Sequence, residues 1–383
     1  MQDFIFHNPT KVAFGKNSIQ QLATLLPKDS KVLLLYGGGS IKKNGVYDTV
    51  MQQLTTHEVV EFGGIEANPE YTTLMKAVEL VKQHHIDFLL AVGGGSVVDG
   101  TKFVAAAAEF DGEPWDILAK GVEVKSAVPL GCVLTLPATG SETNIASVVN
   151  RSELGKKLSF LSEHVRPQFA VLDPQTTYSL PDRQLANGVV DAFVHVMEQY
   201  LTYPVNATVQ DRFAEGILQN LIELGPRVFE KDNYEVRANL MWNATQALNG
   251  LIGAGVPQDW ATHQIGHELT ALYGLDHAVT LAIVLPQMMR HQRSDKREKL
   301  LQYASRVWHL DTSDEEAAID QAIVKTEQFF QQMGMKIYLH EHNVEETVVR
   351  LVPRKLMENG MMSFGERGNL TPKDAELIIK AAL

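Results

Sequence analysis

The chain has 383 residues, of which 45% are hydrophobic and 21% charged, proportions typical of a folded protein and not of a disordered one. A single hydrophobic core stops growing at ~250–300 residues, so this length predicts two domains. The net charge of −12 argues against nucleic acid and anionic membranes as partners, because their phosphates would be repelled.

The first half of the chain alternates apolar runs of strand length with helical patterns. The stretch FIFHNPTKVAF, residues 4–14, alternates like an edge strand. Continuous apolar strands separated by helices indicate a parallel sheet covered on both faces. The further predicted segments are a strand with a glycine turn at 31–40, a strand at 57–65, a helix at 73–86, a strand, glycine turn and helix at 87–110, and a strand with a small-residue loop at 132–144.

The pattern changes near residue 180. Pro174 and Pro181 mark the change, and long helical patterns follow with almost no strand signal. We therefore predict an α/β domain over residues 1–180 and an all-helical domain over residues 181–383. The last predicted helix, within LTPKDAELIIKAAL, opens at a threonine N-cap followed by proline.

Cysteine content and apolar run lengths bear on where the protein resides. The single cysteine, Cys132, lies in an apolar run, which favours a buried, unreactive thiol, excludes an internal disulfide and suits a reducing compartment. The first residues lack the basic and apolar regions of a secretory signal, and no apolar run approaches the ~20 residues of a membrane span. A cytoplasmic protein is expected.

Two glycine turns follow predicted strands, YGGGS at 36–40 and VGGGSVVDG at 92–100. Glycine lets the backbone approach a ligand closely, and the following helix offers free N–H groups to an anion, so a phosphate-bearing ligand is predicted at the carboxyl ends of these strands. Neither turn matches the dinucleotide fingerprint G-x-G-x-x-G. The first turn offers Ser40 and the nearby Lys42 and Lys43 but no carboxylate, which favours NADP(H) over NAD(H), although the two lysines would also suit a solvated helix surface.

A second group of residues has the chemistry of a metal site. Asp191 and His195 are four residues apart on a helical pattern, as are His263 and His267, and His277 follows a glycine turn. Asp191, His195, one of the pair His263 and His267, and His277 would bind a divalent cation such as Zn²⁺ or Fe²⁺. The glutamate follows the second histidine of the pair, His267, and not the first, so the metalloprotease motif H-E-x-x-H is absent.

With these residues identified, the chain resembles the iron-containing (group III) alcohol dehydrogenases, and most closely the bacterial NADPH-dependent aldehyde reductase or butanol dehydrogenase branch. The matching stretches are FHNPTKVAFGK, VGGGSVVDGTK, TLPATGSETN, LANGVVDAFVHVMEQYL and HQIGHELTALYGLDHAVTLAIVLP. The resemblance implies a Rossmann-like, parallel-sheet nucleotide domain followed by a helical metal-binding domain, the dehydroquinate synthase-like fold. It implies a metal bound by Asp191, His195, His263 and His277, with His267 beside the substrate as a proton relay.

The resemblance also implies which residues contact the cofactor. Gly38, Gly39 and Ser40 match the segment around the adenosine 2′ position, and Asn68 matches a residue near the adenosine half. Gly94, Gly95 and Ser96 match the pyrophosphate contacts, and Asp99 falls near the nicotinamide end. Thr135, Thr139 and Asn144 match contacts on and after one strand, and Lys157 matches a lysine facing the cofactor, with Lys156 beside it as the alternative.

The implied activity is reversible hydride transfer between NADP(H) and a small aldehyde or alcohol, with zinc or iron at the site, in a homodimer formed through the N-terminal stretch. Three alternatives remain: a dehydroquinate synthase-like enzyme, a glycerol dehydrogenase-like metal and NAD enzyme, and a non-catalytic nucleotide-binding protein. The synthase would need Lys, Arg and Glu clustered around an anionic substrate, and the stretches DWATHQIGHELTALYGLDH and TYSLPDRQLANG offer few such cations.

Overall fold

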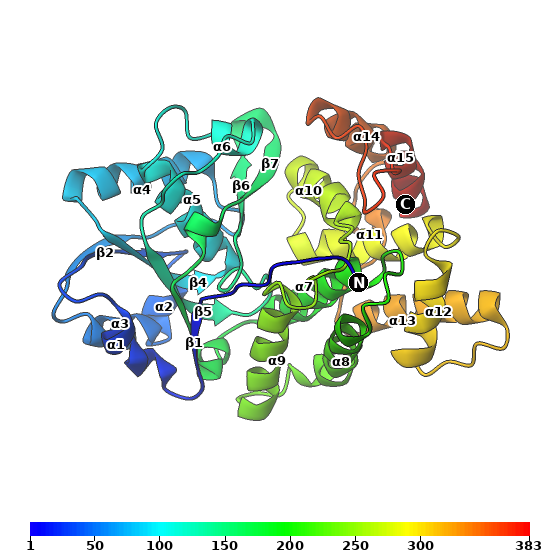
Figure 1. Ribbon diagram of the computed structural model, residues 1–383, viewed down its shortest axis with the longest axis horizontal. Helices are drawn as coiled ribbons and strands as arrows, with labels where there is room; N and C mark the ends of the chain where they lie inside the picture. The colour runs from blue at the N-terminus through cyan, green and yellow to red at the C-terminus, as the bar shows by residue number, and fades with distance from the viewer. The chain divides into compact units, whose positions relative to one another are not determined.

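The computed structural model describes all 383 residues, which group into two units (Figure 1). The sheet unit comprises His7–Pro181 and Glu230–Thr245, and the helical unit comprises Met1–Phe6, Asp182–Phe229 and Gln246–Leu383. Two segments do not follow a single division at residue 180. Met1–Phe6 belongs to the helical unit, and Glu230–Thr245 belongs to the sheet unit. A division into separately folding domains at that residue stays a prediction.

A six-stranded parallel sheet forms the centre of the sheet unit, in the order β1-β8-β5-β4-β2-β3. The predicted α/β class with a parallel sheet is therefore confirmed. Its strands are β1 (Lys11–Phe14), β2 (Lys31–Tyr36), β3 (Glu58–Phe62), β4 (Phe88–Gly94), β5 (Leu130–Leu136) and β8 (Phe169–Leu172).

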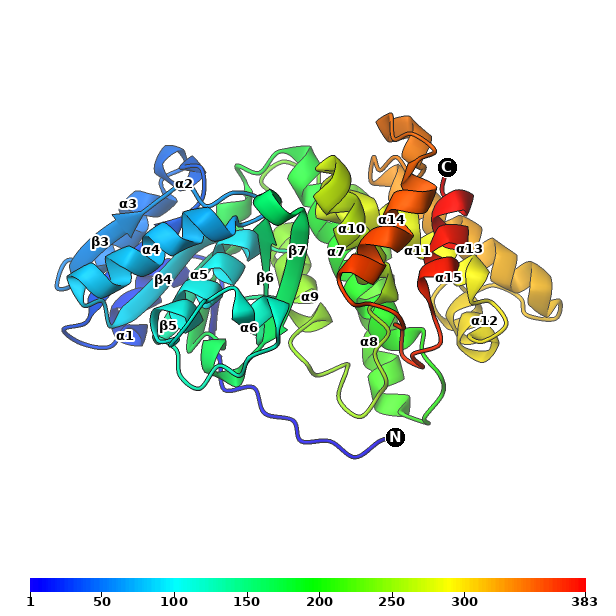
Figure 2. The same ribbon diagram turned by 90° about the horizontal axis from the view of Figure 1, so that it is seen from above.

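Helices cover both faces of this sheet, because alternate residues of each apolar strand point to opposite sides. In β2, Leu33 and Leu35 belong to the core that includes α4 and α5, whereas Val32 and Leu34 belong to the core beneath α1 and α3. Figures 1 and 2 show these two sets of helices on opposite sides of the sheet. The helices are α1 (Leu22–Leu25), α2 (Ser40–Lys43), α3 (Val46–Gln53), α4 (Tyr71–His84), α5 (Gly95–Ala108) and α6 (Asp116–Ala119).

Two features of the sheet unit differ from the sequence prediction. The N-terminal stretch forms a strand only over Lys11–Phe14, because its partner β8 offers four residues for pairing. An antiparallel hairpin of β6 (Ala146–Arg151) and β7 (Lys156–Leu161) lies where no strand was predicted. Half of its strand residues are polar, and Val149 and Phe160 are its only buried apolar side chains, so the apolar signal is weak.

Helices alone build the helical unit, as predicted. They are α7 (Asp182–Tyr200), α8 (Thr208–Leu224), α10 (Ala261–Tyr273), α11 (His277–His291), α12 (Arg297–Arg306), α13 (Glu315–Gln332), α14 (Val348–Glu358) and α15 (Pro372–Ala381), while most of α9 (Tyr234–Ala247) lies in the sheet unit. The predicted cap of the last helix is confirmed, since Thr371 Oγ1 donates to Asp374 Oδ2 at 2.6 Å. None of the helices combines the length and apolarity that crossing a membrane requires.

Candidate metal centre and nucleotide-binding turns

The four side chains expected to bind a metal converge within the helical unit. Asp191 and His195 lie one turn apart on α7 and are 3% and 4% exposed. Ligand atoms of Asp191, His195 and His263 all lie within 4.8 Å of one another. His277, the first residue of α11, completes the group, with its Nε2 3.6 Å from Asp191 Oδ1.

The separations within this group fit a shared cation better than direct hydrogen bonds. Asp191 Oδ1 lies 3.7 Å from His195 Nε2 and 3.6 Å from His277 Nε2, too far for hydrogen bonding. Two ligands held ~2.1 Å from a tetrahedral ion lie about 3.4 Å apart, close to these distances. Asp191 Oδ1 is buried and makes no hydrogen bond, a costly state for a carboxylate unless a cation neutralises it.

A short turn between α10 and α11 brings His277 back toward His263. Gly274 ends α10 with φ +67°, a left-handed conformation that favours glycine. Asp276, the N-cap of α11, is hydrogen-bonded by the Arg183 guanidinium and by Asn187 Nδ2 at 3.0 Å. These bonds tie the turn to α7, the helix that carries the other two proposed ligands.

His267 lies beside the group and not within it. Its ring centroid is 5.3 Å from that of His277 and 6.2 Å from that of His263. The cluster of ligand atoms includes His263 and not His267, which favours His263 as the ligand of this pair. His267 is half-buried, so it is placed between the metal centre and solvent.

Glu198, which sequence analysis missed, contacts the imidazole of His263 at Nδ1. One of its carboxylate oxygens pairs with His263 Nδ1, and the other accepts from Thr262 N at 2.6 Å. Burial raises the pKa of Glu198 to about 8. A carboxylate on one imidazole nitrogen fixes the ring so that the opposite nitrogen faces the metal. Its place one turn after His195 on α7 was the available signal.

The two glycine turns end neighbouring strands of the sheet unit. β2 and β4 are adjacent while β3 lies outside β2, so the order of strands reverses between β2 and β4. Crevices at such a reversal are where open α/β sheets bind nucleotides. At Gly95 a Cβ would stand 2.3 Å from Thr139 Oγ1, so glycine there lets the Thr139 loop close over the turn.

Several predicted cofactor residues contact one another in the sheet unit. Lys157 Nζ donates to Asn68 Oδ1 at 2.9 Å, which places Lys157 and not Lys156 beside Asn68. Asp99 Oδ1 accepts from Ser141 Oγ at 2.5 Å, in the loop that carries Thr139 and Asn144. The remaining predicted residues lie at strand ends: Gly38, Gly39 and Ser40 after β2, Gly94, Gly95 and Ser96 where β4 meets α5, and Thr135 in β5.

Lys102, also missed, anchors that loop from α5. It is fully buried, and its Nζ donates to Ser141 Oγ at 2.9 Å, Asn144 Oδ1 at 2.9 Å and Ala146 O at 2.8 Å. Burial lowers the pKa of Lys102 to about 8. Its spacing three residues after Asp99 was the only sequence signal.

Lys42 is exposed on its helix, as the alternative of a solvated lysine expects, and it also pairs with an acidic side chain. Its Nζ lies 2.8 Å from Glu61 Oε2 and 4.5 Å from the centre of the Tyr47 ring. Glu61 lies in β3, next to the turn that ends β2, so a carboxylate is present near the predicted adenosine segment after all. The ammonium group of Lys42 forms an ion pair with this carboxylate and so neutralises its charge.

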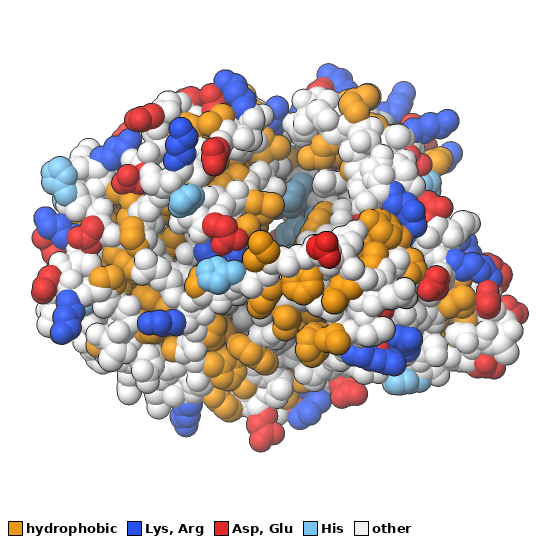
Figure 3. Space-filling model, in the orientation of Figure 1, with side chains coloured by type: hydrophobic (Ala, Val, Ile, Leu, Met, Phe, Trp, Pro, Cys, Tyr) orange, Lys and Arg blue, Asp and Glu red, His pale blue; other side chains and the backbone are white.

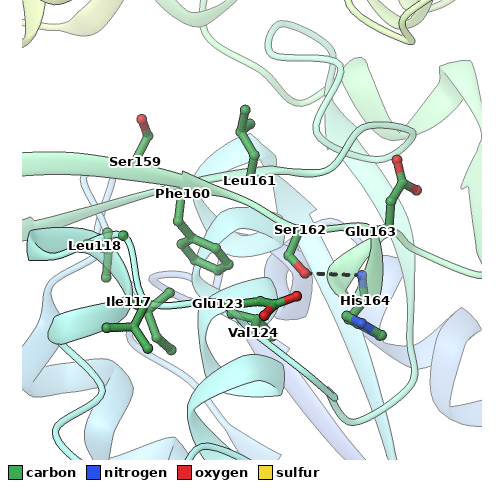
Figure 4. A pocket seen from close by; sticks show the side chains of 12 residues that line it. Ile117, Leu118, Glu123, Val124, Ser159, Phe160, Leu161, Ser162, Glu163 and His164 are labelled. Atoms are coloured by element: carbon green, nitrogen blue, oxygen red, sulfur yellow. Dashed lines mark hydrogen bonds between the residues drawn. The ribbon is translucent and has the colours of Figure 1, made fainter.

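A separate cavity of about 580 Å³ opens in the sheet unit between α6, the loop after it and β7 (Figure 4). Its wall combines apolar side chains such as Ile117 and Phe160 with Glu123 and His164. The predicted cofactor and metal residues do not line it.

On the face drawn in Figure 3, basic and acidic side chains are interspersed, so this face has no extended patch of a single charge sign.

Comparisons with known proteins agree with the sequence resemblance. The family model "Iron-containing alcohol dehydrogenase" matches residues 9–174, and the model "Fe-containing alcohol dehydrogenase family, C-terminal" matches residues 185–383. The chain is 56% identical to NADPH-dependent aldehyde reductase YqhD of Escherichia coli K12 and 41% identical to probable NADH-dependent butanol dehydrogenase 1 of Bacillus subtilis 168, each covering 100% of both chains.

Solved structures show the same relationship. The crystal structure of E. coli K-12 YqhD matches with a TM-score of 0.99 at 56% identity, covering 100% of this chain and 99% of that one. NADH-dependent butanol dehydrogenase A from Thermotoga maritima matches with a TM-score of 0.96 at 34% identity, over 100% of this chain and 99% of that one.

Proposed function

Because the chain belongs to the iron-containing alcohol dehydrogenase family, we propose that it is a metal-dependent, NADP(H)-linked enzyme that interconverts small aldehydes and primary alcohols. The observation that carries this proposal is the convergence of Asp191, His195, His263 and His277 around one point in the helical unit. A relative that is 56% identical over its full length is an NADPH-dependent aldehyde reductase, which supports the same reaction here.

The proposed roles follow from the donor set. Asp191, His195, His263 and His277 would hold zinc or iron, both of which suit imidazole and carboxylate ligands. Such an ion supplies a Lewis acid for the carbonyl oxygen. Asp191 brings a single negative charge to the four ligands, so the centre keeps a net positive charge that suits an oxygen gaining electrons.

The sheet unit is the proposed binding site for NADP(H). The turn residues Gly38, Gly39, Ser40, Gly94, Gly95 and Ser96 expose backbone N–H groups near the strand ends, and α5 opens there with its N-terminus. Asn68, Asp99, Thr135, Thr139, Asn144 and Lys157 are the proposed side-chain contacts. Ser40 and Lys42 would donate hydrogen bonds to the 2′-phosphate that distinguishes NADP(H) from NAD(H).

The decisive test is NADPH consumption at 340 nm with butanal, before and after treatment with a chelator. Consumption that the chelator suppresses and added zinc or iron restores supports the reductase. A dehydroquinate synthase-like enzyme or a nucleotide-binding protein would bind the cofactor without net oxidation of NADPH. A glycerol dehydrogenase-like enzyme would favour NAD⁺ and a polyol.

Replacing His267 with alanine is expected to lower kcat for butanal about 10²-fold, the usual contribution of a positioned acid or base. Metal content should stay that of the wild type, because His267 is proposed to lie beside the ligands and not among them. Steady-state kinetics and metal analysis on the same preparation check this. A loss of metal together with kcat would show that His267 is a ligand and not a proton relay.

Replacing Lys42 with alanine is expected to raise KM for NADPH roughly fivefold, since it leaves the Glu61 carboxylate facing a phosphate without its counter-ion. KM for NADH should change less than twofold. Lys43→Ala is the matched control, because Lys43 is an exposed neighbour on the same short helix. Equal effects on both cofactors would remove Lys42 from the proposed 2′ site.

Assembly and location are also proposed from the family. A homodimer would form through the N-terminal stretch: β1 is the edge strand of the sheet, and Ile5 is 97% exposed. Light scattering measures this assembly. A cytoplasmic location suits the one free cysteine, Cys132, which is fully buried.

A further inference from the structure

Trp260 has an unusual backbone for its residue type. It lies just before α10 with φ +64° and ψ 3°, in the left-handed region. Eight residues other than glycine have positive φ, and the other seven are Asn, Asp or His, the types that tolerate this conformation best. A bulky aromatic residue held there is strained, and such strain persists where the surroundings impose it, often at functional sites.

The residues before and after Trp260 explain why the strain persists. Asp259 N donates to Glu198 O at 2.9 Å, and Asp259 Oδ1 accepts from Ala261 N at 3.0 Å. The other oxygen of Asp259 pairs with the buried Lys296, which also donates to Leu201 O at 2.7 Å. The backbone on both sides of Trp260 is therefore fixed by buried hydrogen bonds.

The indole ring is held against two of the proposed metal ligands. Its centroid lies 5.3 Å from the His263 ring, edge-on at 73°, and 6.2 Å from the His195 ring. Trp260 is half-buried, and its Nε1 donates to the exposed Gln258 at 2.9 Å. The ring thus presents an apolar surface that reaches from the metal centre to the exterior of the helical unit.

Trp260 and His267 lie on opposite sides of His263 along α10. Trp260 is about one turn before His263, and His267 is about one turn after it, so the indole leaves the proposed proton relay clear. The indole centroid lies within 6.2 Å of two of the proposed ligand rings, so an alkyl chain that extends from the metal centre on this side would contact it.

We propose that Trp260 is a specificity-determining residue, whose indole packs against the alkyl chain of the aldehyde and so favours longer apolar substrates over short ones. This inference rests on the proposed reductase function. An apolar chain gains free energy for each methylene that it removes from water, so the indole should make kcat/KM rise with chain length. The left-handed backbone at Trp260 then lowers the stability of the fold, and its benefit is the contact that the indole makes with the substrate.

The test compares Trp260→Phe, Trp260→Ala and Trp260→Gly with the wild type. We expect the ratio of kcat/KM for hexanal to that for acetaldehyde to fall about tenfold in the alanine and glycine variants and about twofold in the phenylalanine variant. Acetaldehyde kinetics should change less than threefold, and metal content should be unchanged. The glycine variant should melt at a higher temperature than the alanine variant, because only glycine adopts φ +64° without strain.

Three outcomes would overturn the inference. An equal proportional loss for both aldehydes, or a loss of metal, would mean that the ring merely supports His195 and His263. Wild-type kinetics for both aldehydes, or a higher hexanal ratio, would mean that the ring does not attract the alkyl chain. A metal-loaded wild-type protein that reduces neither aldehyde would instead overturn the proposed function, and this inference with it.

Discussion

Replacing His263 with alanine is expected to abolish metal binding and to lower aldehyde reduction by about 10³-fold or more. The variant removes one of the four proposed ligands. An ion held there would supply several kcal/mol of stabilisation to the developing negative charge, and ~4 kcal/mol corresponds to about 10³-fold in rate. Metal analysis of protein purified without added ions and NADPH oxidation at 340 nm measure the two effects.

NADPH affinity should survive the same change. All the residues proposed to contact the cofactor belong to the sheet unit, whereas His263 belongs to the helical unit. Fluorescence titration with NADPH should therefore give a Kd within about twofold of the wild type. His291→Ala is the matched control, since it removes an imidazole from the last residue of α11 and should keep both metal and turnover. Normal turnover in the His263 variant would refute the assignment of the metal centre.

Replacing Glu198 with glutamine is expected to weaken metal binding about 10- to 100-fold, the usual effect of losing the partner of a ligand imidazole. Glutamine keeps the size of the side chain and can still accept from Thr262 N, but it removes the carboxyl oxygen that pairs with His263 Nδ1. Competition with a chromogenic chelator measures the affinity directly.

The stability of the metal-free variant separates this effect from misfolding. Burial raises the pKa of Glu198 to about 8, so the folded protein holds a proton there that the unfolded chain releases above its ordinary pKa. The protein therefore loses stability as the pH rises from the ordinary pKa of a glutamate to about 8, and neutral glutamine removes this loss. The melting temperature of metal-free Glu198→Gln should be no lower than that of metal-free wild type. A lower melting temperature with unchanged metal affinity would assign Glu198 a structural role alone.

Much of the metal centre could be predicted because its signal is local. Asp191 and His195 are four residues apart on one helical pattern, which places both side chains on the same face whatever the rest of the fold. No local feature of the sequence distinguished His263 from His267 as the metal ligand. Both lie on one face of α10, and only the position of α7 against that face determines which of them joins Asp191.

The residues that sequence analysis missed act through partners distant in the chain. Glu198, Lys102 and Glu61 matter because of His263, Asn144 and Lys42, and no spacing rule connects these pairs. The left-handed backbone before α10 was equally hidden, since aromatic residues rarely adopt it. The hairpin of β6 and β7 was missed because half-buried polar strands lack the continuous apolar run that revealed the parallel sheet.

The chain passes from one unit to the other four times, after residues 6, 181, 229 and 245. The consequence concerns expression of fragments. A polypeptide ending at residue 180 would lack α9, whose Trp242 ring lies 5.7 Å from Phe14 and whose Arg237 donates to Thr177 O at 2.6 Å. Such a truncation would leave apolar sheet surface bare and prone to aggregation. The sheet unit should therefore be obtained in isolation only when the segment 230–245 is supplied, for example by a linker that bypasses the intervening helices.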